Sequence, residues 1–341
     1  MKKFVLNDFQ HKKGLHCSST AIMNVCFYYG HHLSEAMCFG IGEGLDFIYT
    51  ANPNATPQIS LIGRSPFFEP VFFKNIGYDW RIKRLGNLDH KTIKSNLIKG
   101  NPSILITDLY YLDYVNSKNY YSGHSIVITG YDDEKKQYFI SDSLNSQIEK
   151  SSYESVENAI SSIAPPLYIN NQHFYLDYFQ IQEVFEAGLI ALKKNALKML
   201  KPPKHNMGAQ GMELALSQMN KWSSINDWSM FCILVYEMNE KRGSGGAAFR
   251  NLFKDFLAEL SVYYQFLLEF HEKFSKICEI WGEFLAVVGE AGVRQNSSLL
   301  IKAEKLFKEI VWKEKDFYQT LVKEVDNYGI NIEGYKKLSR R

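Results

Sequence analysis

The sequence predicts an α+β first half followed by an all-α second half. Short runs rich in β-branched and aromatic residues, with the length of buried strands, occur up to about residue 177. Beyond that point such runs vanish, and apolar residues recur at helical spacing with Lys and Glu on the other faces. We therefore expect a mixed domain over residues 1–177 and a helical domain over residues 178–341.

Length and composition argue against several classes of protein. The 341 residues are 45% hydrophobic, which is enough for two substantial cores. Lys and Arg number 39 against 37 Asp and Glu, so the chain lacks the basic excess typical of nucleic-acid-binding proteins. Its start turns polar too early for a signal peptide, and its apolar runs are too short to span a membrane. The five cysteines, an odd number, indicate reduced thiols in a cytoplasmic protein.

The first expected helix covers residues 18–29. Ala21, Ile22 and Val25 recur at helical spacing, and Gly30 is well placed to end the helix.

A glycine-rich segment, FGIGEG over residues 39–44, follows a short helical turn over residues 34–38. Its alternate glycines invite a nucleotide-binding interpretation, but the full fingerprint is missing and no convincing strand precedes it. We predict a flexible loop there, open to a role in lining a substrate pocket, and no nucleotide cofactor.

The remainder of the first half predicts one more helix and three strands. Residues 91–99 form the helix and residues 102–107 a buried strand. Residues 124–131 and 138–142 are two further strands, joined as a hairpin by the polar turn at 132–137.

The helical half is expected to break at three places, namely residues 201–203, 243–246 and 289–292, because each contains at least two Pro or Gly residues. Its aromatic stripes are typical of a helical core. Self-association of these amphipathic helices into a homo-oligomer stays open.

Cys17 stands where a loop gives way to the first helix, a position whose amides and dipole favour a thiolate. His124 opens a strand, and Asp142 ends its hairpin partner, so the two residues reach the same end of the ribbon. Taken one at a time, Cys17 is typical of a buried core thiol, His124 of a histidine at a strand end, and Asp142 of a residue that caps a turn. Together they have the order and context of papain-like enzymes: nucleophile, base and orienting acid. Asn145 and Asp132 are the alternative orienting groups.

The oxyanion donors are less evident. The backbone amide of Cys17 supplies one donor. Papain-like enzymes place a glutamine six residues before the cysteine, where this chain has His11; Gln10 is one residue further off, and His16 adjoins the cysteine. Histidines crowd residues 11–32, but their spacing matches no common zinc pattern, so we expect no metal.

Several segments resemble the butirosin biosynthesis protein H family. They are residues 16–21, 24, 29–30, 33–36, 38–45, 124–132, 245–250 and 256–257. The resemblance therefore extends over nearly the whole chain and includes the helical domain that usually follows.

The resemblance implies an acyltransferase in secondary-metabolite (antibiotic) biosynthesis, in which Cys17, His124 and Asp142 form the triad. Proteins of this family take an acyl group from a carrier-protein thioester and pass it to an amine, there an aminoglycoside. The partners implied are an acyl carrier protein, whose phosphopantetheine arm delivers the substrate, and a small-molecule amine, with no dissociable cofactor. We expect the helical half to shape the acceptor pocket and exclude water.

Two alternatives remain open. A cysteine peptidase or amidase uses the same triad with water as acceptor. A binding protein that has kept the fold without catalysis is the second. A helical lid over the site would indicate acyl transfer to an amine, whereas an open, extended groove would indicate hydrolysis of a peptide substrate.

Overall fold

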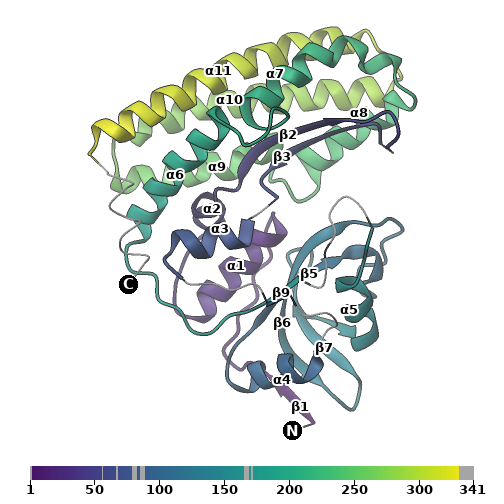
Figure 1. The fold of residues 1–341 in the computed structure, drawn as a ribbon, viewed down its shortest axis with the longest axis vertical. Coiled ribbons are helices and arrows are strands. Elements are labelled where there is room, and N and C mark those ends of the chain that lie inside the picture. Colours follow the sequence, from purple (N-terminus) through teal and green to yellow (C-terminus); the bar gives the residue numbers. More distant parts are fainter. Residues whose placement is uncertain are drawn as a thin grey trace. The chain divides into compact units, whose positions relative to one another are not determined.

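The computed structural model describes residues 2–55, 57–66, 68–78, 83–84, 89–164, 169 and 172–329. The chain divides into two compact units, each built from two stretches of chain (Figure 1). Unit 1 contains Met1–Cys38 and Tyr78–Gln182, and unit 2 contains Phe39–Gly77 and Glu183–Arg341.

This division differs from the predicted one, which assigned residues 39–77 to the first domain. The reason is a hairpin of strands β2 (Leu45–Ala51) and β3 (Ile59–Arg64), which the sequence analysis did not predict. Phe47 of β2 packs against the rings of Trp281 and Phe307, both in helices of unit 2. Burial of these aromatic rings explains why the hairpin belongs to unit 2.

Unit 1 is organised around an antiparallel sheet, which has seven strands in the part of the chain described. The order is β4-β9-β5-β6-β7-β8, and β1 also pairs with β6. The strands are β1 (Lys3–Val5), β4 (Lys83–Arg84), β5 (Ser103–Asp108), β6 (Ser122–Asp132), β7 (Gln137–Ser141), β8 (Glu149–Ser152) and β9 (Gln172–Tyr175). The central strand β6 is buried along its whole length.

The described part of unit 1 also contains helices α1 (Cys17–Tyr28), α4 (His90–Ile98) and α5 (Tyr153–Ile160), the start of α2 (Glu35–Ile41) and a 3₁₀ turn at Leu109–Tyr111. Helix α1 packs against β6. Asp89 caps α4 by accepting from two backbone amides, and Ser152 caps α5. The apolar faces of α4 and α5 join the sheet in one core, which includes Ile93, Leu105, Ile126 and Val156.

The helix predicted over residues 18–29, the helix over 91–99 and the strand over 102–107 correspond to α1, α4 and β5. The predicted hairpin is also present, with Asp132 opposite Gln137 at the turn. The mixed α+β character of the first half and the helical character of the second are confirmed.

The glycine-rich segment is not a flexible loop, and this prediction was wrong. Helix α2 (Glu35–Ile41) extends into residues 39–41, and every residue of the segment 39–44 is buried except the half-buried Glu43. A side chain at Gly40 would meet the ring of Phe256 at 2.2 Å, and one at Gly42 would meet the ring of Phe68 at 2.5 Å. The glycines are therefore close-packing positions beneath aromatic rings.

Unit 2 is a helical layer that holds the β2–β3 hairpin (Figure 1). Its helices are α3 (Phe68–Asn75), α6 (Val184–Leu200), α7 (Gly208–Gln218), α8 (Trp228–Tyr236), α9 (Arg250–Tyr263), α10 (Leu267–Val293) and α11 (Leu299–Asn327), with short 3₁₀ turns at Met219–Ser224 and Ala247–Phe249 and a π-helical turn at Glu237–Lys241. The long helices α10 and α11 lie side by side.

The break predicted at residues 289–292 is absent, because α10 continues through it to Val293. Gly289 and Gly292 allow α8 to approach α10 closely. A side chain at Gly289 would lie 2.7 Å from the ring of Tyr236, and one at Gly292 would lie 2.5 Å from the carbonyl oxygen of Ser229. The breaks at 201–203 and 243–246 are present.

A buried ion pair ties unit 2 together. The guanidinium of Arg250 meets the carboxylate of Glu314 at 2.8 and 3.1 Å, and both side chains are almost completely buried. Trp281 and Tyr318 also donate to this carboxylate, at 2.5 and 3.0 Å. The other guanidinium nitrogen donates to the carbonyl of Ala248, in a left-handed turn. Every partner is therefore satisfied, which a buried pair requires.

Glu314→Ala should destabilise the protein strongly, because it leaves the Arg250 charge buried without its carboxylate. We expect a loss of about 3–5 kcal/mol in the free energy of unfolding, measured by denaturant titration. The control is Lys315→Ala, which removes an exposed pair with Glu213 and should cost at most about 1 kcal/mol. Equal losses in the two variants would contradict the assignment.

Candidate active site

Cys17 is the first residue of α1, one residue before the predicted start of the helix at residue 18. His16 caps the helix, and its ring accepts the backbone N–H of Ser19. Cys17 is 8% exposed, with its Sγ 3.9 Å from the hydroxyl of Ser18 and 4.0 Å from the carbonyl oxygen of Gly123. The positive end of the helix dipole favours the thiolate at this position.

The carboxylate of Glu35 fastens the chain around the candidate nucleophile. It accepts the backbone N–H groups of Leu15 and His16 at 2.9 and 2.7 Å. It also accepts from the hydroxyls of Ser19 and Thr20, both at 3.0 Å. One carboxylate from α2 thus fixes the transition from loop to helix, a role that the sequence analysis missed because it depends on packing between two helices.

His124 and Asp142 meet because β6 and β7 form a hairpin. His124 lies near the start of β6, and Asp142 directly follows β7. The Nε2 of His124 donates to Oδ1 of Asp142 at 2.9 Å, and the two side chains are 4% and 0% exposed. The structure therefore brings together the predicted base and its predicted orienting acid.

Two further donors hold the Asp142 carboxylate. The backbone N–H of Leu144 donates to Oδ1 at 3.0 Å, and the hydroxyl of Tyr114 donates to Oδ2 at 2.7 Å. Tyr114 is a second residue that the sequence analysis missed. It lies in a tyrosine-rich connection between β5 and β6, which was the only available signal.

The alternative orienting groups have other partners. Asp132 lies at the opposite end of the hairpin and accepts the backbone N–H groups of Glu134 and Lys135, both at 3.1 Å. The carbonyl of Asn145 accepts from the ring of His11. Among the three candidates, Asp142 is the one in contact with His124.

The charges of this site support one another. Burial disfavours the charged form of His124, but the negative charge of Asp142, with hydrogen bonds to Asp142 and Cys17, raises the pKa of His124 well above its ordinary value. Burial also opposes ionisation of Asp142, but the charge and hydrogen bond of His124 lower the pKa of that carboxyl. The site therefore favours a carboxylate beside an imidazolium, with a thiol placed to lose its proton.

The three residues predicted as oxyanion or substrate contacts have different positions. Both ring nitrogens of His11 are engaged, one with the hydroxyl of Ser141 at 2.8 Å and one with the carbonyl of Asn145 at 2.9 Å. His11 therefore braces the segment around the orienting acid. His16 is buried as the helix cap, and Gln10 is the exposed residue among these three.

The other four cysteines are buried and free of disulfides. Cys26 lies inside α1, and Cys38 is fully buried in α2. Burial raises the pKa of Cys232 and of Cys278 to about 12, so these thiols are poor nucleophiles.

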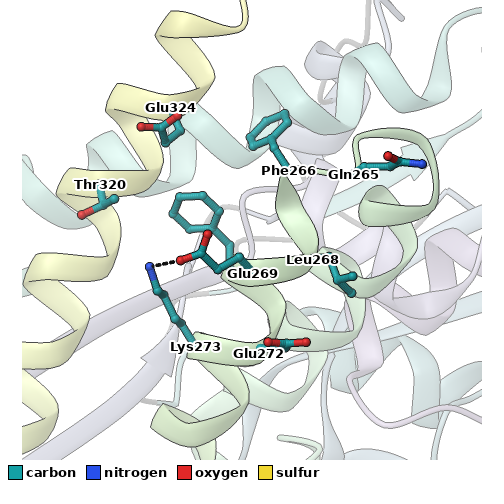
Figure 2. Close-up of a pocket in the computed structure, with 9 residues that line it drawn as sticks. Gln265, Phe266, Leu268, Glu269, Glu272, Lys273, Thr320 and Glu324 are labelled. Carbon is teal, nitrogen blue, oxygen red and sulfur yellow. Dashed lines mark ion pairs between the residues drawn. The ribbon is translucent and has the colours of Figure 1, made fainter.

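A groove of about 520 Å³ lies at the start of α10 and the end of α11, and Figure 2 shows the side chains that line it. Its walls carry Glu269, Glu272 and Glu324, and Lys273 pairs with Glu269 across 2.6 Å. All its lining residues belong to unit 2, and none is a member of the Cys–His–Asp set.

Within the described ranges, no three His, Cys, Asp or Glu residues gather as a metal ion would require. None of the helices in those ranges has the length and apolar character needed to cross a membrane.

Residues 16–143 match the family described as butirosin biosynthesis protein H, N-terminal, and residues 154–321 match a domain of unknown function, DUF4872. The resemblance predicted from the sequence is confirmed: the chain carries a butirosin biosynthesis protein H N-terminal domain followed by this second domain.

Among solved structures, the chain is similar to a candidate C39-like peptidase from Bacillus anthracis. The two are 17% identical, the match covers 53% of this chain and 100% of the other, and the TM-score is 0.37. The comparison with curated proteins finds no match.

Glu35→Ala should loosen the segment around Cys17, because it leaves four donors without their acceptor. We expect a loss of about 1–3 kcal/mol in the free energy of unfolding, measured by denaturant titration. Glu134→Ala, which removes an exposed pair with Lys2, serves as the control and should change it by about 0.5 kcal/mol or less. A loss no larger than in the control would show that Glu35 does not brace the helix start.

Asp142→Asn should lower the pKa of His124, because the negative charge that stabilises the imidazolium is lost. The ring should then lose its proton at a pH at least about one unit lower than in the wild type, measured by NMR titration of labelled histidine. Asp132→Asn removes a carboxylate at the far end of the same hairpin and should leave this titration unchanged. The assignment is wrong if the two variants titrate alike.

Proposed function

We propose that the protein transfers an acyl group from a thioester to an amine through an acyl-Cys17 intermediate, as a step of secondary-metabolite biosynthesis. The acyl donor is expected on the phosphopantetheine arm of an acyl carrier protein, and the acceptor is a small-molecule amine. The reaction needs no resident cofactor.

One observation carries the proposal: a cysteine at a helix N-terminus that interacts with His124, itself held by a buried carboxylate. This geometry supports a thiolate nucleophile beside an imidazolium. The match to butirosin biosynthesis protein H supports a role in biosynthesis, because that name describes a biosynthetic protein; transfer of the acyl group to an amine is part of our proposal.

In the first step, the Cys17 thiolate attacks the thioester carbonyl, and the negative charge moves to the carbonyl oxygen. The backbone amide of Cys17 is the expected donor to this oxyanion. The carbon–sulfur bond to the carrier then breaks, and the His124 imidazolium supplies the proton to the leaving thiolate. The carrier departs as a free thiol and leaves the acyl group on Cys17.

In the second step, a neutral amine attacks the acyl-Cys17 carbonyl while His124, now neutral, takes the amine proton. The bond between carbonyl carbon and Sγ breaks, and the amide is released. Cys17 returns as the thiolate and His124 as the imidazolium. Because a thioester is already activated, the protein mainly supplies position and charge stabilisation.

The alternative is a peptidase or amidase, in which water replaces the amine in the second step. The same triad supports it, so the acceptor decides between the two.

Cys17→Ala should abolish formation of an acyl-enzyme. We expect no acyl adduct by intact-protein mass spectrometry after incubation with a short acyl thioester of N-acetylcysteamine. Turnover should fall by about a thousandfold or more. Cys26→Ala, a buried thiol of the same helix, is the matched control and should keep both adduct and turnover.

The acceptor is tested on the wild-type protein with the same thioester and a set of primary amines, aminoglycosides among them. The proposal expects the acyl-enzyme to yield amide in preference to free acid. Free acid as the sole product with every amine, together with cleavage of peptide or amide substrates, would favour the peptidase alternative. An undiminished adduct in Cys17→Ala would refute the nucleophile.

A further inference from the structure

The Asp142 carboxylate is held at both oxygens. The N–H groups of His124 and Leu144 converge on Oδ1, at 2.9 and 3.0 Å. The hydroxyl of Tyr114 donates to Oδ2 at 2.7 Å. With donors on both oxygens, the plane of the carboxylate is fixed, so Oδ1 points at the imidazole in one direction only.

Tyr114 is itself held in place by the chain around it. Its connection between β5 and β6 is anchored by Asp108, which accepts the backbone N–H of Tyr110 at 3.1 Å and of Tyr121 at 2.8 Å. The neighbouring Asp113 accepts the backbone N–H of Ser152 at 3.0 Å. A side chain on such an anchored turn can aim its hydroxyl reproducibly.

We propose that Tyr114 is a positioning residue for the catalytic pair: its hydroxyl holds the Asp142 carboxylate in the orientation that keeps His124 aligned with Cys17. The inference rests on the proposed function, because it assigns Tyr114 a role only through that triad. It adds a fourth member, from the connection between β5 and β6, which no sequence motif marks.

The charges around this contact are consistent with such a role. Burial, followed by the charge of Asp142, raises the pKa of Tyr114 well above its ordinary value, so the phenol stays protonated and can donate. Glu149 and Asp113 also face Tyr114 and act in the same direction. On the other side, His124 faces the carboxylate and interacts in turn with Cys17.

Removal of the hydroxyl has a defined consequence. Tyr114 is among the groups that lower the pKa of Asp142, so Tyr114→Phe raises it. As the pH falls, Asp142 then gains a proton earlier, the His124 imidazolium loses its support, and Cys17 loses its thiolate character. The acid limb of Cys17 reactivity therefore moves to higher pH.

The test measures alkylation of Cys17 by iodoacetamide as a function of pH, with the modified peptide quantified by mass spectrometry. Tyr114→Phe should move the acid limb up by about one unit, which is about a tenfold slower reaction at each pH on that limb. Tyr153→Phe is the matched control, because it removes a similar tyrosine–aspartate bond, to Asp133 at 3.0 Å, elsewhere in unit 1. Its profile should equal that of the wild type.

A positioning role also predicts loss of the effect when its target is absent. In an Asp142→Ala background, Tyr114→Phe should cause no further change in the profile. If Tyr114→Phe fails to fold, 3-fluorotyrosine at position 114 replaces it. This nearly isosteric residue is a stronger donor, and it should move the acid limb to lower pH.

The inference is overturned if the acid limb of the Cys17 alkylation profile does not move in Tyr114→Phe or in the 3-fluorotyrosine protein. It is also overturned if Tyr153→Phe shifts this limb equally. A third contradicting result is that Tyr114→Phe shifts the limb in the Asp142→Ala background as much as it does in the wild type. The alkylation assay uses neither thioester nor amine, so its result can be interpreted even if the protein proves not to be a transferase. A wild-type Cys17 that reacts only as an ordinary thiol overturns the proposed nucleophile itself.

Discussion

The hydrogen bond between His124 and Asp142 is the interaction on which the candidate site depends. Both side chains are buried, so neither ionised form is tolerable without the other. The hairpin of β6 and β7 supplies the proximity, and the Asp142 carboxylate then sets which imidazole nitrogen carries the proton toward it. The other nitrogen is left to serve the thiol, which is the arrangement that a cysteine nucleophile requires.

A second set of contacts gives the thiol its place. Glu35 gathers the amides and hydroxyls at the start of α1, so the helix begins at one defined residue. His11 and Asn24 both reach the hydroxyl of Ser141, at 2.8 and 3.2 Å, and so connect the segment before α1 with the end of β7. The nucleophile and its acid–base partners are thus linked by polar contacts that do not include the reacting groups. These contacts fix the relative positions of Cys17 and its partners without engaging the thiol, which can therefore gain or lose its proton.

The helical unit is organised differently, around the buried pair of Arg250 and Glu314. The Cζ of the Arg250 guanidinium lies 4.4 Å from the centroid of the Trp281 ring, and Trp281 also donates to the Glu314 carboxylate. The guanidinium reaches backbone carbonyls of the β2–β3 hairpin region, including Asp46 at 3.2 Å. This explains why residues 39–77, although they come early in the chain, belong with the helices.

The sequence by itself determined the features that depend on neighbours along the chain. Helical spacing placed the start of α1 within one residue of Cys17, and a short polar turn paired the strands that carry His124 and Asp142. Only the tertiary structure decided the braces from Glu35 and Tyr114. Their partners lie between 15 and 28 residues away, where periodicity and turn length carry no information. Such contacts arise from the fit of packed surfaces, and no local pattern encodes that fit.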